Sequence, residues 1–138
     1  MAGAVQYIVV RRDIDMSRGK MAAQVAHASL GAVLPHFRGA NRYVSHHERF
    51  ADFAADIEEW LDGAFTKVVL AVDDRTALER VVARLDERRI PHEVVRDICR
   101  TELAPEDSDG TTPTCVGVCP LRRESVPGFL RGLPLWRD

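Results

Sequence analysis

The sequence predicts an α/β fold: a single domain over residues 1–138, built as a three-layer α/β/α sandwich with a small four-stranded mixed, mostly parallel sheet. Short runs of β-branched residues alternate along the chain with longer segments whose apolar residues recur at helical spacing. A strand, a helix and a second strand follow one another between residues 66 and 97, an order that implies a right-handed parallel crossover. A hydrophobic content of 46% over 138 residues is enough for one compact core.

The first strand and the helix after it organise the rest of the chain. The strand covers Val5–Arg11 and is rich in β-branched residues. Ser17 is a suitable N-cap for a helix that runs to residue 34, because its hydroxyl can accept a hydrogen bond from a first-turn amide. Lys20, Gln24 and His27 project from one side of this helix, near N-terminal amides that favour anions. The alternative is that they form the solvated face of an ordinary amphipathic helix.

The remaining elements are predicted in the same way, from apolar runs typical of strands and from apolar residues at helical spacing. A polar stretch that contains glycine predicts a loop from Pro35 to His46. The near-continuous apolar run over residues 66–72 indicates a strand buried on both faces, and Asp73 or Asp74 is expected to cap the helix after it. In chain order we expect a helix over 47–61, a strand over 66–72, a helix over 74–89, a strand over 92–97, a polar loop over 102–113, a last short strand over 114–119 and a tail from residue 121 with only a brief helix.

The composition indicates a cytoplasmic protein without a disulfide framework. No apolar run is long enough to span a membrane, and Arg11 and Arg12 interrupt the N-terminal apolar run before a signal peptide is complete. Three cysteines are an odd number, which argues against a secreted disulfide scaffold. Cys115 and Cys119 have no second Cys or His pair nearby in the sequence, so neither zinc nor another metal is expected.

The charge is distributed unevenly along the chain. The formal net charge of −2 by itself argues against a nucleic-acid partner. Residues 1–42, however, contain six basic residues against two acidic ones, whereas residues 48–62 contain six acidic residues against one basic residue. A basic region around a site can attract a polyanion even on an acidic protein, although ordinary surface charge is the alternative. The basic residues of the first region are Arg11, Arg12, Arg18, Lys20, Arg38 and Arg42.

Two strand ends are candidate sites, since ligands gather at the carboxyl ends of strands in open α/β sheets. The first strand leads to Lys20, and the strand over 92–97 ends at Asp97, which is followed by Arg100 and Thr101. If these strands are neighbours, Lys20 and Asp97 face each other across one edge. A carboxylate, a cation and a hydroxyl at this place can orient a water molecule and stabilise a developing oxyanion. The alternative, which the spacing alone slightly favours, is an ion pair between Asp97 and Arg100 that only fixes the loop.

Four blocks of the chain resemble the type II peptidyl-tRNA hydrolase family. They read QYIVVRRDIDMSRGKMAAQVAHASLGAV, KVVLAVDD, IPHEVVRDICRTELAP and TCVGVCP. The blocks occur in the order of the family and cover nearly the whole chain. The most specific part is RGKMAAQVAHA, and the RTELAP segment after Asp97 supports the resemblance independently.

The resemblance implies a cofactor-free esterase that cleaves the ester between a peptide and the 3′ end of tRNA. By their positions in the motifs, Lys20 is similar to the family's catalytic lysine, Asp97 to its essential aspartate and Thr101 to the threonine of the same turn. Asp97 and Thr101 are then expected to position the water, and Lys20 to stabilise the oxyanion. Peptidyl-tRNA as the partner and a homodimer are further implications. The residues expected to support the site or face the tRNA are Gln24, His27, Arg100, Arg11, Arg12 and Arg18.

The chain departs from the family pattern close to the expected site. Cys99 and Glu106 stand where the family has glycines, and Cys119 replaces the second glycine of its GxGP pattern. Glu106, Asp107 and Asp109 lie in a loop that is longer than usual, and their charge would repel phosphates unless the loop points away. Two alternatives therefore stay open. One is a non-catalytic module that binds tRNA or a protein, and the other is a hydrolase with a changed substrate or one that uses the Cys99 thiol.

Overall fold

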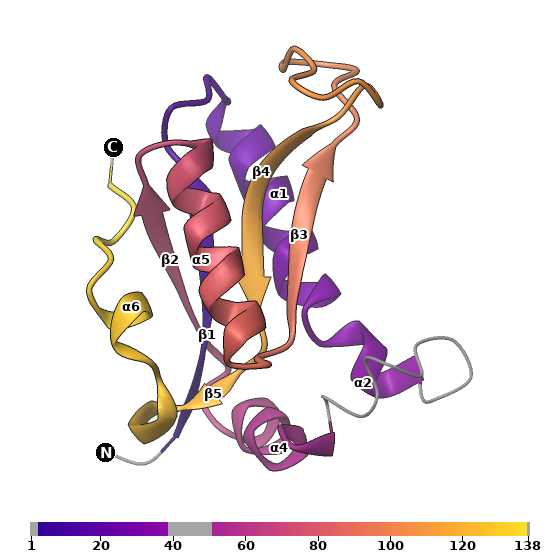
Figure 1. Cartoon of the computed structure of the whole chain (residues 1–138). Coiled ribbons are helices and arrows are strands. Elements are labelled where there is room, and N and C mark those ends of the chain that lie inside the picture. Colours follow the sequence, from indigo (N-terminus) through magenta and orange to yellow (C-terminus); the bar gives the residue numbers. More distant parts are fainter. Residues whose placement is uncertain (1–2, 39–50, 138) are drawn as a thin grey trace.

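The computed structural model describes residues 3–38 and 51–137, which form one mixed sheet with helices around it (Figure 1). The main strand order is β2-β1-β4-β3, and a short β5 pairs with β1. The strands are β1 (Ala4–Arg11), β2 (Thr66–Val72), β3 (His92–Asp97), β4 (Thr112–Val118) and β5 (Leu121–Arg122). The helices are α1 (Arg18–Gly31), α2 (Leu34–Arg38), α4 (Ala54–Asp62), α5 (Arg75–Glu87) and α6 (Gly128–Arg131), with a 3-10 turn, η1 (Arg123–Ser125). In the described ranges, no helix has the length and apolar character needed to cross a bilayer.

Among the strands of the described residues, β1 and β2 form the one parallel pair, so the prediction of a mostly parallel, four-stranded sheet is wrong. β2 runs parallel to β1, whereas β4 is antiparallel to both β1 and β3, and β5 is antiparallel to β1. α5 connects two strands that point the same way, but β2 and β3 lie at opposite edges of the main sheet. The reason is β4. The strand predicted as a short last one over 114–119 is a seven-residue central strand, buried throughout, that separates β1 from β3.

The sheet lies between α1 on one face and α5 on the other (Figure 1). Successive residues of a strand point to opposite faces, so each strand contributes to two packed layers. On the α1 side, the buried cluster contains Ile8, Val10, Ala28, Val95 and Cys115. On the α5 side, the larger cluster includes Val5, Val9, Leu78, Val81, Leu85, Val116 and Val118. This arrangement provides the helix layers that the sequence predicts on the two faces.

The N-terminal caps of the two long helices agree with the sequence. Ser17 Oγ accepts a hydrogen bond from the backbone N–H of Lys20, and α1 begins at the next residue, Arg18. Asp74, one of two residues proposed for the second cap, accepts a hydrogen bond from the N–H of Ala77 at 2.9 Å. Each cap satisfies a first-turn donor that has no partner inside its helix. The helical registers of α1 and α5 are therefore set at their first turns.

Two element boundaries and the burial of one strand differ from the predictions. Pro35 lies in α2 rather than in a loop, since proline is tolerated in the first turn of a helix. Residues 39–46 of that predicted loop, and residues 47–50 of the predicted second helix, lie outside the described residues; α4 itself begins at Ala54. β2 is an edge strand, so only Leu70–Val72 is fully buried, and the predicted burial on both faces is wrong for its first half.

α1 approaches β4 closely, and a glycine makes this contact feasible. A Cβ atom at Gly117 would lie 2.1 Å from the carbonyl oxygen of Ala28, so the helix and the strand meet where there is no side chain. Gln24, which the helical spacing places beside Lys20 on an outward face, is instead buried here, and Thr114 Oγ1 donates to its Oε1 at 2.6 Å. These contacts fix the rotation of α1 and thereby the direction in which Lys20 projects.

Candidate active site

Lys20 and Asp97 form an ion pair at the end of the sheet where the carboxyl ends of β1 and β3 lie. Lys20 lies in the first turn of α1, and Asp97 is the last residue of β3. Lys20 Nζ donates to Asp97 Oδ1 at 2.7 Å and to Thr101 Oγ1 at 3.2 Å. The lysine and aspartate side chains are 15% and 6% exposed, so their attraction is screened less than that of a surface pair. The structure thus brings together the three residues that the sequence singles out as catalytic candidates.

Lys20 and Asp97 are in contact although β1 and β3 are not neighbouring strands. The sequence predicts this contact for the case in which the two strands are neighbours. Each of these strands is antiparallel to the β4 strand between them, so both run in the same direction and end at the same edge of the sheet. α1 follows β1 in the chain and packs against both β4 and β3. The first turn of α1 therefore reaches Asp97 across β4.

The turn after Asp97 holds the second oxygen of its carboxylate. Asp97 Oδ2 accepts a hydrogen bond from the backbone N–H of Cys99 at 3.1 Å, and Cys99 Sγ donates to the carbonyl oxygen of Asp97 at 3.4 Å. Cys99 has a φ of 58°, in the left-handed region that glycine occupies with least strain. Arg100 is exposed, and among the contacts of the described residues the ion pair of Asp97 is made with Lys20, not with Arg100.

A second link joins this turn to the start of α1. The backbone N–H of Ser17 donates to Glu102 Oε2 at 2.9 Å, and Ser17 Oγ donates to Glu102 Oε1 at 2.6 Å. These hydrogen bonds hold the pKa of Glu102 below its ordinary value, because they favour the charged carboxylate. Glu102 is not among the residues that the sequence indicates for the site. The signal for it was its place in the RTELAP segment, directly after Thr101.

The acidic loop that follows is held by arginines. Glu106 accepts two hydrogen bonds from Arg11, at 2.7 and 2.9 Å, and Asp107 accepts from Arg75 at 2.8 Å and from Arg96 at 3.2 Å. Glu106 raises the pKa of Arg11, and Arg11 in turn holds the pKa of Glu106 below its usual value. The carboxylates of Glu106 and Asp107 are therefore paired within the fold, which reduces the repulsion of phosphates that the sequence suggested.

The six residues expected to support the site or face tRNA separate into two groups. Gln24 and Arg11 are buried and bond to protein partners, so the fold uses them internally. The other four are exposed: Arg12, Arg18, His27 and Arg100. Arg12 Nε donates to Asp73 Oδ1 at 2.9 Å on the surface. These four side chains are therefore in contact with solvent, whereas those of Gln24 and Arg11 are buried.

The three thiols lie in different environments. Cys99 is partly exposed beside Asp97, whereas Cys115 and Cys119 are fully buried. Burial raises the pKa of Cys115 to about 11 and also raises the pKa of Cys119. Cys99 is therefore the thiol that a reagent can reach in the folded protein. Within residues 3–38 and 51–137, no group of three or more His, Cys, Asp or Glu side chains is placed to hold a metal ion.

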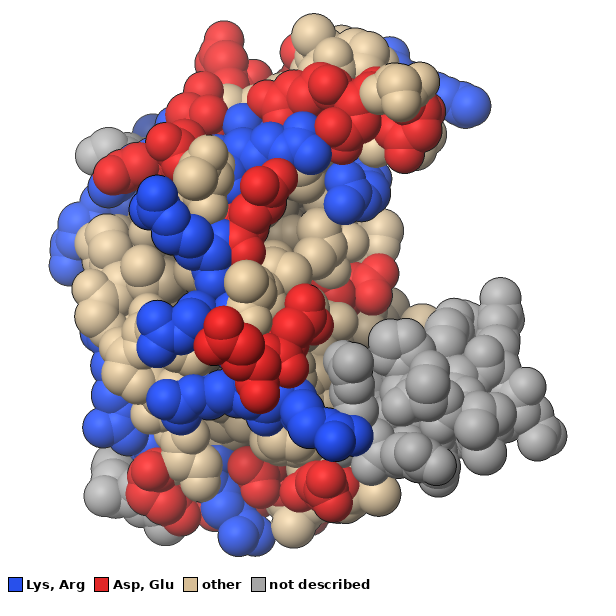
Figure 2. Space-filling view, viewed as in Figure 1, with Lys and Arg blue, Asp and Glu red and all other residues tan. Residues whose placement is uncertain are grey.

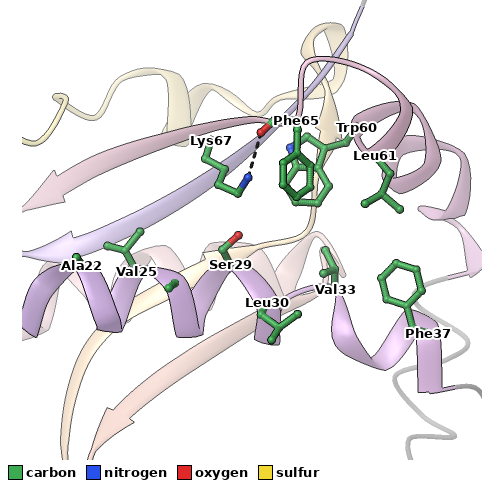
Figure 3. A pocket seen from close by; sticks show the side chains of 11 residues that line it. Ala22, Val25, Ser29, Leu30, Val33, Phe37, Trp60, Leu61, Phe65 and Lys67 are labelled. Carbon is green, nitrogen blue, oxygen red and sulfur yellow. Dashed lines mark hydrogen bonds between the residues drawn. The ribbon is translucent and has the colours of Figure 1, made fainter.

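An apolar pocket of about 530 Å³ lies along another side of α1 (Figure 3). Its walls come from α1, α2, α4 and the start of β2, and they include the exposed side chains of Leu30, Phe37 and Phe65. Lys67 Nζ donates to the carbonyl oxygen of Phe65 at 3.1 Å and lies over its ring, and burial lowers the pKa of this lysine. None of the three catalytic candidates lines this pocket, so it is separate from the ion-pair site.

The ion-pair site has the groups that acyl-transfer chemistry requires. A carboxylate next to a hydroxyl can orient a water molecule toward a carbonyl carbon. An ammonium that is largely shielded from solvent can stabilise the negative charge that then develops on the carbonyl oxygen. Lys20 also lies in the first turn of α1, where the helix dipole favours an anion.

Residues 4–136 match the family described as peptidyl-tRNA hydrolase PTH2, and this range includes every candidate site residue. Three similar proteins are each described as a peptidyl-tRNA hydrolase. The one from Methanopyrus kandleri is 41% identical over 96% of this chain and 97% of its own length. The one from Aeropyrum pernix is 35% identical over 97% of both chains. The one from Haloquadratum walsbyi is 33% identical over 95% of this chain and 98% of its own length.

Proposed function

The chain belongs to the PTH2 family of peptidyl-tRNA hydrolases, and from this we propose that Lys20, Asp97 and Thr101 carry out the hydrolysis of the ester between peptide and tRNA. The observation that carries the proposal is the position of Lys20 Nζ, which lies within hydrogen-bonding distance of both Asp97 Oδ1 and Thr101 Oγ1. An ammonium from α1 and a carboxylate and a hydroxyl from the end of β3 and its following turn meet there, and Thr101 is exposed to solvent.

The proposed reaction is a direct attack by water. Asp97 and Thr101 orient a water molecule, whose oxygen attacks the ester carbonyl carbon. Lys20 donates to the carbonyl oxygen as it becomes negatively charged. The bond between the carbonyl carbon and the ribose oxygen then breaks, that oxygen takes up one of the two protons of the attacking water and leaves as the free hydroxyl of tRNA, and the other proton passes to solvent. The peptide is released with a new carboxylate.

Exposed cations near this site are suited to hold the tRNA. Arg18 begins α1, two residues before Lys20, and Arg100 lies in the turn between Asp97 and Thr101. Phosphate groups are bound mainly by such side chains, which fix the position of the nucleic acid without reading its sequence. We assign the phosphate contacts to these exposed residues rather than to Arg11, whose guanidinium is buried and bonded to Glu106.

The test is release of free tRNA from purified peptidyl-tRNA in the presence of a metal chelator. We expect Lys20→Ala and Asp97→Asn each to lower kcat/KM by about 100-fold or more, since each removes a group that acts on the transition state. Thr101→Ser should retain more activity than Thr101→Ala. The matched control is Lys67→Ala, which removes the other lysine of the chain from the separate apolar pocket. A folded wild-type protein that binds tRNA without turnover would overturn the proposal in favour of a binding module.

Two further expectations stay predictions. The resemblance implies a homodimer, and the composition indicates a cytoplasmic protein. Light scattering of the purified chain checks the first, because a dimer doubles the molar mass of 15.4 kDa. Fractionation of cells that express the chain checks the second.

A further inference from the structure

Glu102 connects the two segments that supply the candidate catalytic residues. It lies in the turn that follows β3, one residue after Thr101, and both of its carboxylate oxygens bond to Ser17 at the start of α1. Ser17 in turn accepts a hydrogen bond from the backbone N–H of Lys20 at 3.1 Å. A continuous chain of hydrogen bonds therefore runs from the turn, through Glu102 and Ser17, to the backbone of Lys20.

This series of hydrogen bonds lies beside the ion pair of Lys20 and Asp97. The segment from Asp97 to Glu102 and the start of α1 meet at two places, the Glu102–Ser17 link and the contacts of Lys20 Nζ with Asp97 and Thr101. Two points of contact define both the separation and the relative orientation of the segments, whereas one point leaves them free to pivot. Thr101 is the direct neighbour of Glu102, so the same link restrains the hydroxyl that lies 3.2 Å from Lys20 Nζ.

The two donors of Ser17 require a side chain at position 102 that ends in two polar atoms. Ser17 presents a backbone N–H and a hydroxyl to Glu102, and the hydroxyl still has a lone pair for the N–H of Lys20. A carboxylate accepts from both donors at once. A glutamine has the same shape, and it can accept from the backbone N–H while its amide N–H₂ donates to the hydroxyl. An alanine can do neither.

We propose that Glu102 is a positioning residue of this hydrolase, which holds Lys20 and Thr101 in register by fastening the turn after β3 to the N-cap of α1. This rests on the proposed function of Lys20, Asp97 and Thr101. Glu102 does not touch the reacting atoms; it acts through Ser17 and Thr101. Small displacements of catalytic groups reduce the rate of the chemical step more than they reduce binding, so the effect belongs in kcat.

The test compares Glu102→Ala, Glu102→Gln and Ser17→Ala in the assay of peptidyl-tRNA hydrolysis. We expect Glu102→Ala to lower kcat by about tenfold with KM within twofold of wild type, and Glu102→Gln to restore most of the loss. The double variant Glu102→Ala with Ser17→Ala should lose little more than the more damaged single variant, because the two residues act through one link. Glu124→Ala, at an exposed glutamate of η1, is the matched control.

Other outcomes would overturn the proposal in identifiable ways. A change in KM alone would mean that Glu102 contacts the tRNA, and losses that multiply in the double variant would mean that the two residues act independently. Equal damage by alanine and glutamine would mean that the charge, not the link, matters. Circular dichroism and thermal melting of each variant separate a loss of positioning from a loss of fold. Asp97→Asn is assayed in parallel: if it retains full activity, the proposed function fails, whatever Glu102→Ala does.

Discussion

Cys99 occupies a backbone conformation that is unfavourable for a cysteine, next to the carboxylate on which the proposed chemistry depends. Its φ of 58° places it in the left-handed region, where a Cβ atom comes close to the neighbouring carbonyl oxygen. The same conformation directs its N–H toward Asp97 Oδ2 at 3.1 Å. The backbone at position 99 therefore helps to hold Asp97, and this contact does not require the thiol.

Replacing this cysteine by glycine should stabilise the protein without reducing its activity. We expect Cys99→Gly to raise the free energy of unfolding by up to about 1 kcal/mol, since relief of the left-handed strain exceeds the entropy that glycine gains in the unfolded chain. The N–H of residue 99 is retained, so kcat/KM should stay within twofold of wild type. Denaturant unfolding and the hydrolysis assay measure the two quantities.

The control for this prediction is Cys99→Ala, which removes the thiol but keeps a Cβ atom in the strained conformation. It should leave the free energy of unfolding close to that of wild type or below it. Loss of activity in both variants would contradict the prediction, and it would support the thiol-dependent hydrolase that the sequence left open.

Single residues also show what sequence spacing can and cannot determine. Ser17 was predictable as a cap because capping depends on the residue type and its neighbours alone. Gln24 was not predictable as a buried residue: helical spacing places it with Lys20, but it does not say which side of the helix meets the sheet. That side is set by Gly117 and Thr114, about ninety residues further along the chain.

At the scale of elements, the acidic loop is attached to the sheet by one buried arginine. Arg11, at the end of β1, is 3% exposed and donates to both oxygens of Glu106 and to the carbonyl oxygen of Pro113. Pro113 belongs to β4, so Arg11 joins the loop to the strand that follows it. A buried guanidinium needs such acceptors, because an unpaired charge away from water is strongly unfavourable.

Weakening this attachment should destabilise the protein at neutral pH and less so in acid. Glu106→Gln keeps the shape of the side chain but removes one of the two carboxylates that pair with Arg11, the other being Asp13, and we expect a loss of about 1–2 kcal/mol in the free energy of unfolding. The pKa of Glu106 is lower in the folded than in the unfolded protein. The contribution of Glu106 to the free energy of unfolding is therefore fully present above the unfolded carboxyl pKa of about 4.3. It is lost as the pH falls through the lower pKa of the folded protein.

Urea unfolding of wild type and Glu106→Gln at several pH values measures this difference directly. The matched control is Glu79→Gln, which removes an exposed partner of Arg75 on α5 and should cost less than about 0.5 kcal/mol. A difference between wild type and Glu106→Gln that stays constant from pH 7 down to pH 3 would show that the charge of Glu106 does not stabilise the loop.

The elements themselves were largely predictable, but their order in the sheet was not. The apolar patterns of β1 and α5 are strong enough to find these elements, and the Ser17 N-cap, which is local too, marks the start of α1. β4 was predicted as a short last strand, since nothing local in TCVGVCP says that it lies between two other strands. Its central place depends on pairing with both β1 and β3 at once, and this long-range contact reverses the predicted majority of parallel pairs.

At the scale of the whole molecule, the distribution of charge limits where tRNA can bind. On the face seen in Figure 2, with α5 toward the viewer in Figure 1, Lys and Arg side chains are interspersed with Asp and Glu. Such a surface has no continuous basic area to follow a phosphate backbone. The net charge of −2 also gives no general attraction to a polyanion. We therefore place tRNA binding away from this face, at the exposed cations proposed above, Arg18 and Arg100, which lie near the ion pair of Lys20 and Asp97.

Salt dependence tests this local mode of binding. If Arg100 contacts one phosphate, Arg100→Ala should weaken the binding of deacylated tRNA and lower the slope of log Kd against log salt concentration by about 1. Because the contact positions the tRNA and takes no part in the chemical step, kcat at saturating substrate should change little. Arg80→Ala removes an exposed arginine of α5, on the other face of the sheet, and should leave the slope unaltered. Equal slopes for wild type and Arg100→Ala would assign the phosphate contacts to other cations. An equal decrease of the slope in Arg100→Ala and Arg80→Ala would mean that tRNA binding depends only on the total charge of the protein.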